Sequence, residues 1–289
     1  MDLIDTSNST ISNQKLFNPF RGTEYLTRGG YGHIFRLAID TAVVVKIAHR
    51  IVGTGTTAGD EPRAAEALEI LRRKRTVHEA LDARQPPHPN IVEYFLSTDI
   101  AIFIKFEPET VERRPSRRFA TPITEARQFL WIKEMASAAS WLESLDYFHG
   151  DLRPENMLLD EAEHVKVVAG PEHEQFAIGS CIYTIRTGEV PYGQWETPEE
   201  FKTMYDALVQ GQYPSTKDDG ILGYVISSCW HSSYSSVAEV EAAIERAVGG
   251  VMLCEHESGA APRSVRDHDR CVQKCREFLA QQGEGGQEQ

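Results

Sequence analysis

The sequence is poor in cysteine. Its 289 residues include five cysteines, which form no Cys-x-x-Cys pair and are too sparse for a disulfide framework. This usage fits a reducing compartment. Cys271 and Cys275 stand four residues apart, so we expect them to share one face of a helix. Because no paired histidines accompany them at ligand spacing, packing explains these two residues better than a metal site does.

Positive charge is also scarce. Lysine and arginine total 30 against 43 aspartates and glutamates, which gives a formal net charge of −13. Such a chain has little general attraction for nucleic acid or for anionic lipid. The sequence begins without the basic region and apolar run of a secretory signal, and it lacks an apolar run of membrane-spanning length. We therefore expect a cytoplasmic protein, with a nuclear location left open, and neither a nucleic-acid nor a membrane partner.

Apolar residues, at 41% of the chain, are sufficient for a large core. Residues 1–19 are polar and show no periodicity, so we expect a mobile leader, with order beginning near Phe20. Residues 53–59 are rich in glycine and threonine. They predict a linker rather than a phosphate-binding P-loop, because Asp60 stands where such a loop needs lysine.

The stretch from His149 to Asn156 contains the residues best suited to chemistry. Within it, Asp151 is followed by Asn156 after an interval of four residues. If both side chains point into one cleft, the carboxylate can accept the proton of a hydroxyl group and the pair can hold a metal ion. These are requirements of phosphoryl transfer. Asp151 and Asn156 are therefore the leading candidates for a catalytic site.

Two stretches nearer the amino terminus predict strands. Residues 26–35 are typical of a strand, a glycine turn and a second strand. Glycines in that turn let the backbone approach a ligand closely, although a plain hairpin explains them as well. Residues 41–48 predict a further strand, in which Lys46 lies among β-branched residues.

The segments between these motifs predict a regular alternation of elements. A charged helix is expected over residues 61–83, followed by the motif His88-Pro89-Asn90-Ile91-Val92. Two apolar runs of strand length, 91–96 and 100–106, come next. A buried helix over residues 122–144 then leads into the stretch that begins at His149.

Taken in this order, the motifs resemble those of protein kinases, and most closely the small kinase-like proteins of filamentous fungi. The resemblance covers roughly residues 21–248. It implies an α+β fold with two lobes and with ATP in the cleft between them. The small lobe, residues 20–107, would hold a five-stranded sheet and one helix, and the larger, mainly helical lobe would span 108–248. Residues 249–289 would form a partly disordered C-terminal extension.

The resemblance also assigns roles to individual residues. It implies that Asp151 accepts the substrate proton, that Asn156 binds Mg²⁺, and that Lys46 pairs with Glu79. Glu69 is the alternative partner for the lysine. The residues that it places at the nucleotide are Gly29, Gly30, Gly32, Ile34, Lys46, Glu79 and Ile104, and Arg153 joins Asp151, Asn156 and Lys46 in the catalytic set.

The chain departs from the kinase pattern where that pattern binds its principal metal ion. Ala169-Gly170-Pro171 replaces Asp-Phe-Gly, and an alanine side chain cannot coordinate a hard cation. Only Glu172 and His173 then precede Glu174, where the sequence begins to resemble the central helix of the large lobe. The activation segment is thus largely absent, and Gly150 replaces the arginine that would hold a phosphorylated residue of that segment. We expect Mg²⁺ binding to be weak or absent.

Three functions follow from the resemblance. The first is a pseudokinase that binds ATP and acts on an unidentified protein partner as a binding or regulatory module. The second is an active serine/threonine kinase whose sequence lacks the activation segment. The third is a small-molecule phosphotransferase of the aminoglycoside-kinase type, whose loop resembles His149-Gly150-Asp151. Ala169 argues against the third, because that class also needs a metal-binding aspartate after the hairpin. His88-Pro89-Asn90-Ile91-Val92 and Cys229-Trp230 favour the protein-kinase branch.

Overall fold

A computed structural model describes residues 2–5, 15–52, 60–114, 122–148, 150–168, 174–249 and 263–284. The chain divides into two compact units. Unit 1 combines Met1–Pro87, Val92–Phe106 and Pro262–Gln289, and unit 2 combines His88–Ile91 and Glu107–Ala261. The division after Phe106 lies one residue from the expected lobe boundary. Of the extension expected at residues 249–289, the part from Pro262 onward is assigned to unit 1 and the part before it to unit 2.

Unit 1 contains an antiparallel sheet of five strands. Its order is β3-β4-β5-β8-β7. The strands are β3 (Thr23–Gly29), β4 (Gly32–Leu37), β5 (Val43–Ala48), β7 (Tyr94–Ser97) and β8 (Ala101–Lys105). The predicted strand, glycine turn and strand are the β3–β4 hairpin, and the strand expected to carry Lys46 is β5. Together with the helical unit 2, this sheet confirms the predicted α+β fold.

The amino-terminal residues differ from the mobile leader that we expected. β1 (Asp2–Asp5) pairs with β2 (Lys15–Asn18), and β2 also pairs with β6 (Ile51–Val52), in a second, three-stranded sheet. Leucine, isoleucine and phenylalanine in β1 and β2 favour strand pairing over a purely polar leader. Residues 6–14, and the linker expected at 53–59, lie outside the described residues.

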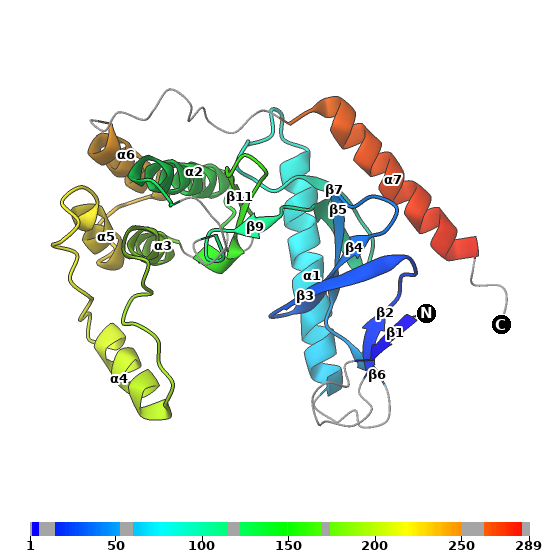
Figure 1. The fold of residues 1–289 in the computed structure, drawn as a ribbon, viewed down its shortest axis with the longest axis horizontal. Helices are drawn as coiled ribbons and strands as arrows, with labels where there is room; N and C mark the ends of the chain where they lie inside the picture. The colour runs from blue at the N-terminus through cyan, green and yellow to red at the C-terminus, as the bar shows by residue number, and fades with distance from the viewer. Residues whose placement is uncertain are drawn as a thin grey trace. The chain divides into compact units, whose positions relative to one another are not determined.

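One face of the five-stranded sheet packs against α1 (Asp60–Asp82), close to the helix predicted from the charge pattern. α1 contacts β5, β7 and β8 (Figure 1). Leu71, Val77 and Leu81 of this helix are buried. Since side chains alternate along a strand, the residues of β5 that face α1 and those that face away form two different surfaces.

The opposite face is covered by α7 (Val265–Glu284), which Figure 1 shows in red. Cys271, Cys275 and Phe278 are buried in one cluster with β4, β5 and β8, so the two cysteines share a helix face as predicted. Burial raises the pKa of the Cys275 thiol to about 12, and a protonated thiol packs as a small apolar group. The Phe278 ring lies 6.1 Å from that of Phe103, with an edge-to-face tilt.

Polar contacts hold α7 at both ends. Arg263, just before the helix, bonds Asp82 at 2.8 Å and Glu93 at 3.1 Å. At the other end the Gln282 side chain accepts from the backbone N–H of Arg21 at 2.9 Å. These contacts join residues far apart in sequence, and they orient the apolar face of α7 toward the sheet.

Unit 2 is built mainly of helices. α2 (Glu125–Glu143) begins at Thr124, whose hydroxyl caps the helix by accepting from the Arg127 N–H. α2 packs against α3 (Gln175–Thr187) and α6 (Val237–Val248), and α3 packs against α5 (Gly223–Trp230) (Figure 1). The other elements are α4 (Pro198–Val209), the short helical turn η1 (Pro154–Asn156) and the strands β9 (Glu109–Thr110), β10 (Met157–Leu159) and β11 (Val165–Val167). The buried helix expected over residues 122–144 corresponds to α2, and the helix expected from Glu174 onward corresponds to α3.

In the stretches of chain that the structure describes, no helix is long and apolar enough to cross a membrane.

The buried face of α7 predicts that unit 1 depends on it for stability. Phe278→Ala removes a ring that is 2% exposed, and it should lower the free energy of unfolding by about 3 kcal/mol or more. Arg276→Ala, on the exposed side of the same helix, should change it by less than about 0.5 kcal/mol. Urea unfolding of both variants measures the difference. Equal effects would mean that α7 does not form part of this core.

Candidate functional site

The glycine turn closes the β3–β4 hairpin in two residues. Gly29 pairs with Gly32, so Gly30 and Tyr31 form the turn itself. A Cβ atom on Gly32 would collide with the Ile47 backbone oxygen on β5, and it would lie 3.7 Å from the Lys46 Cε atom. Around Gly30 the space is open. Gly32 therefore lets the end of the hairpin approach the backbone of β5 closely, beside the Lys46 side chain.

Strand register brings several predicted nucleotide-site residues to one face of the sheet. Ile34 stands opposite Lys46, Lys46 stands opposite Ile102, and Val44 stands opposite Ile104. Because cross-strand partners point the same way and side chains alternate along β5, Ile34, Lys46 and Ile104 share a face. This face packs against α1. Tyr94 is the cross-strand partner of Ile104, and its ring stacks on that of His78 in α1.

A polar cavity of about 330 Å³ lies beside the glycine turn, within unit 1. Two arginines, Arg28 from β3 and Arg63 from α1, line it together with Gly30. Guanidinium groups beside glycine backbone suit phosphate oxygens. Sequence reasoning missed both arginines and also Glu66, which lines the same cavity. Two features of the sequence could have identified these residues. Arg28 directly precedes the glycines, and the three-residue spacing of Arg63 and Glu66 places them on one face of a helix.

A histidine pair adjoins this cavity. His33 Nε2 lies 2.6 Å from His49 Nδ1, and their rings are 4.8 Å apart. Burial lowers the pKa of His33 to about 4, with smaller contributions from His49 and from the positive charge of Arg28. His33 is therefore neutral at pH 7, so it adds no positive charge to the arginines. Sixteen residues separate the two histidines, and no sequence motif links them.

Glu79, the predicted partner of Lys46, makes other contacts. Its Oε1 atom accepts from Ser97 Oγ at 2.6 Å and from Arg75 Nε at 3.1 Å. Glu69, the alternative partner, bonds Arg73 at 3.3 Å on an exposed part of α1. The ion pair between Lys46 and Glu79 stays a prediction.

His78 is a residue of α1 whose pKa is affected by the positive charge of Lys46. Its ring is buried and stacks on Tyr94 at 5.7 Å. Burial lowers the pKa of His78 to about 3, and the positive charges of Lys46 and Lys74 contribute further. A neutral aromatic ring on this helix thus lies near Lys46.

Three of the four predicted catalytic residues, Asp151, Arg153 and Asn156, lie together in unit 2, whereas Lys46 belongs to unit 1. The Asn156 side-chain amide donates to Asp151 Oδ2 at 2.8 Å and to the Asp151 backbone oxygen at 2.9 Å. Arg153 Nε lies 3.3 Å from Asp151 Oδ1. The helical turn η1 brings Asn156 back toward Asp151, and Pro154 begins this turn, since its fixed φ suits a helical start. His149 lies outside the described residues.

Gly150 and Glu174 hold the backbone of this loop. Gly150 has φ +75°, in the left-handed region that glycine adopts without strain. Its N–H donates to the buried Glu174 Oε1 atom at 3.3 Å. Glu174 directly precedes α3, so the helix start positions the loop. Glycine therefore suits the backbone at the position where the kinase pattern has arginine.

Metal ligands are incomplete in the described part of the loop. Mg²⁺ prefers several oxygen ligands in octahedral geometry. The Asn156 amide nitrogen is turned to Asp151, and Ala169, the other predicted metal position, lies outside the described residues. Across the described ranges, no group of three or more histidine, cysteine, aspartate or glutamate side chains could hold a metal ion. The described donors alone do not fit a complete magnesium site.

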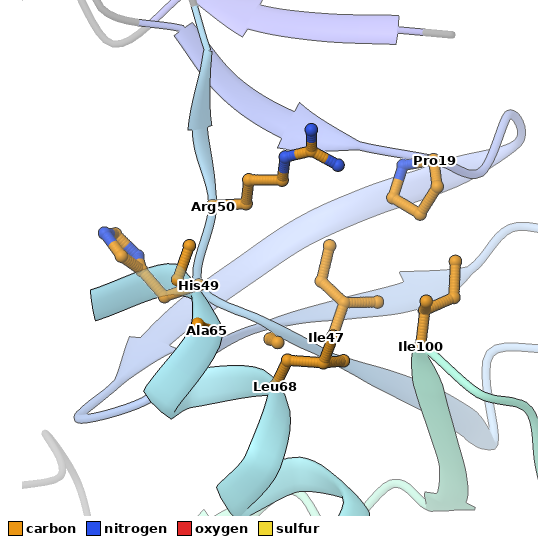
Figure 2. Close-up of a pocket in the computed structure, with 9 residues that line it drawn as sticks. Pro19, Ile47, His49, Arg50, Ala65, Leu68 and Ile100 are labelled. Carbon is orange, nitrogen blue, oxygen red and sulfur yellow. The ribbon is translucent and has the colours of Figure 1, made fainter. Parts of the chain in front are cut away.

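A second cavity, of about 220 Å³, lies between the end of β5 and the first half of α1. Figure 2 shows Arg50 and Pro19 on one side of it and Ile47 and Ile100 on the other. Its walls are mainly apolar, with Leu68 contributed by α1. Such a lining suits an apolar group and offers less to phosphates than the arginine-lined cavity does.

Comparison with known proteins places these motifs in a family. Residues 22–170, just over half of the chain, match the family model for protein tyrosine and serine/threonine kinases. Maternal embryonic leucine zipper kinase of Xenopus tropicalis is 23% identical over 244 residues, covering 71% of this chain and 35% of that protein. Carbon catabolite-derepressing protein kinase of Saccharomyces cerevisiae is 22% identical over 249 residues, covering 70% and 37%. Serine/threonine-protein kinase pkn3 of Myxococcus xanthus is 28% identical over 163 residues, covering 52% and 27%. The chain thus spans about a third of the length of the curated relatives that it matches.

The two turn glycines offer a matched pair of substitutions. Gly32→Ala should lower the free energy of unfolding by about 1–3 kcal/mol, because the new methyl group overpacks against the β5 backbone. Gly30→Ala should change it by less than about 0.5 kcal/mol, since the space there is open. Chemical denaturation measures both. If Gly32→Ala left the free energy of unfolding unchanged, that result would contradict the close contact between β4 and β5.

The buried His78 predicts a pH effect on stability. The folded pKa of His78, about 3, lies below the ordinary histidine value of 6.5, so the unfolded state binds the extra proton first as pH falls. Stability should therefore decrease below pH 6.5, and the His78 contribution between pH 7 and pH 5 should reach up to about 2 kcal/mol. His78→Phe should reduce the loss by that amount, and the exposed control His231→Phe should leave it unchanged. Urea unfolding at both pH values tests this, and identical losses in wild type and His78→Phe would refute it.

Proposed function

The chain belongs to the protein tyrosine and serine/threonine kinase family, and from this membership we propose that it is a nucleotide-binding pseudokinase that acts as a binding or regulatory module. A kinase domain implies ATP binding. The observation that carries the proposal is Ala169, at the position where the family pattern has its principal magnesium ligand.

Unit 1 supports retention of the nucleotide. Lys46 lies under the glycine turn, where Gly32 permits close approach, and Arg28 and Arg63 line the adjacent cavity. In this proposal the cavity receives the phosphates, and cationic side chains with backbone N–H groups neutralise them. Ile34 and Ile104, on the same face as Lys46, supply apolar contacts for the base.

The chemistry of the loop supports impaired transfer. Phosphoryl transfer depends on a metal ion that neutralises charge developing on the phosphate oxygens. Asn156 retains an amide oxygen, but Ala169 contributes no ligand. Between Val168 and Glu174 the sequence has only five residues, too few for the segment that orients a peptide hydroxyl in kinases. Misplacement of that hydroxyl by one ångström costs about 10²-fold in rate.

A second candidate, an active serine/threonine kinase, is favoured by one observation. Asp151 and Asn156 lie within hydrogen-bond distance, so they are close enough to serve together in proton acceptance and in metal binding. In this alternative the loop would act once a further segment completed the metal site and positioned the substrate.

Thermal unfolding with ATP separates these functions. We expect ATP to raise the melting temperature of the wild type by a similar, small amount with and without Mg²⁺, because Ala169 leaves the metal poorly held. Lys46→Ala should abolish the shift, and the exposed control Lys217→Ala should keep it. Ala169→Asp should make the shift grow with Mg²⁺. A large wild-type shift that needs Mg²⁺ would favour the active kinase.

Activity assays on the same proteins complete this test. Neither the wild type nor Ala169→Asp should transfer phosphate to a peptide, since both lack the positioning segment. Robust peptide phosphorylation by either would reject the pseudokinase proposal. The absence of any ATP-induced shift would reject the nucleotide-binding part of it.

A further inference from the structure

α4 is the helix of unit 2 with the least support from its neighbours. None of its residues is buried, whereas α2, α3, α5 and α6 each contain several buried residues. Figure 1 shows α4 standing apart from α3 and α5, at the end of two connecting stretches. Its start is nevertheless well formed, because Thr197 and Glu200 make a reciprocal capping box. The sequence thus specifies a helix whose residues all remain at least partly exposed.

An apolar stripe runs along the exposed side of this helix. Phe201, Tyr205 and Val209 follow one another at four-residue spacing, so their side chains lie above one another on one face. They are 42%, 53% and 68% exposed. Trp195, just before the helix, is 52% exposed and extends the stripe, since its ring lies 4.9 Å from that of Phe201.

Such a patch differs from scattered exposed residues. Single apolar side chains on a surface are ordinary, but contiguous aromatic patches with polar surroundings mark interaction sites. Tryptophan and tyrosine are also the residues most enriched among those that dominate binding energy. The surface of α4 therefore has the composition of a protein interface.

Charge around the stripe restricts the kind of partner. From Glu189 to Gln210, both included, the sequence has five acids and one base. The base, Lys202, is already bonded to Asp206. Backbone N–H groups of Glu196 and Thr197 bond the Glu200 carboxylate and lower its pKa, so it stays ionised at pH 7. The rim of the stripe is thus acidic.

We propose that the α4 stripe, formed by Trp195, Phe201, Tyr205 and Val209, is a docking surface for a basic amphipathic helical segment of a partner protein. The partner's apolar side chains cover the stripe, and its lysines or arginines face the acidic rim. A second copy of the chain fits less well, because symmetric contact would bring the same acids together. This surface lies outside the nucleotide-binding cavity and on the other unit, so the proposal stands independently of ATP binding.

A designed peptide tests the proposal on the full-length protein. The probe is a labelled amphipathic helix with leucines on one face and lysines on both flanks, and a second probe has glutamates in place of lysines. We expect the lysine peptide to bind and the glutamate peptide to bind at least about tenfold more weakly, measured by fluorescence anisotropy.

Variants locate the binding surface. Val209→Ser and Tyr205→Ala should each weaken the lysine peptide by about tenfold, and Val265→Ser, which changes a similarly exposed valine on α7, should have no effect. Glu196→Lys combined with Glu199→Lys should weaken the lysine peptide and strengthen the glutamate peptide. Thermal unfolding checks that the variants remain folded, as expected for exposed positions.

Three outcomes would overturn the proposal. They are equal binding of the two peptides, equal losses for Val209→Ser and Val265→Ser, and a concentration-dependent dimer that Tyr205→Ala disrupts. The last result, from sedimentation velocity, would assign the stripe to a second copy of this chain instead.

Discussion

The structure of unit 1 depends on covering both faces of one five-stranded sheet. β5 shows the constraint most clearly, because Val43, Val45 and Ile47 belong to the cluster that α7 covers, whereas Lys46 lies on the α1 face. Side-chain alternation makes these assignments inseparable, since a shift of one residue in β5 would bury the lysine in the apolar cluster. The position of the lysine below the glycine turn is therefore secured by apolar packing on the opposite side of the sheet. A candidate phosphate site and a hydrophobic core are two consequences of one register.

Sequence patterns predicted the elements whose signals are local. The β3–β4 hairpin, α1 and α2 follow from a glycine turn, proline-bounded charged residues and a 3.6-residue apolar period. Contacts between distant segments were not predictable in this way. Nothing near Phe278 indicates that its ring meets Phe103, and nothing near His33 indicates the contact with His49. Glu79 shows a further limit: counting residues from a motif identifies a position along α1, but it does not give the contacts that the Glu79 carboxylate makes with Ser97 and Arg75.

The loop from Gly150 to Asn156 combines a departure from the family's sequence pattern with a defined backbone contact. Gly150 takes a positive φ and donates its N–H to Glu174, so the loop stays attached to the start of α3 although glycine replaces the family's arginine there. Asp151 and Asn156 keep their mutual contact. Their proximity reflects the short stretch of chain between them, in which Pro154 begins the turn η1. The roles of these residues in chemistry are a separate matter, because fold alone does not determine activity.

The docking of α7 also has a consequence for how the protein folds during synthesis. The strands of unit 1 are complete once Lys105 has been made, yet the helix that covers their outer face begins at Val265. All the helices assigned to unit 2 must leave the ribosome in the interval. Until then Phe35, Val45 and Phe103 lack one side of their packing, in a sheet with exposed apolar surface. Packing between α7 and strands so much earlier in the sequence slows folding. Unit 2 is therefore the first part of the chain that can complete its own core.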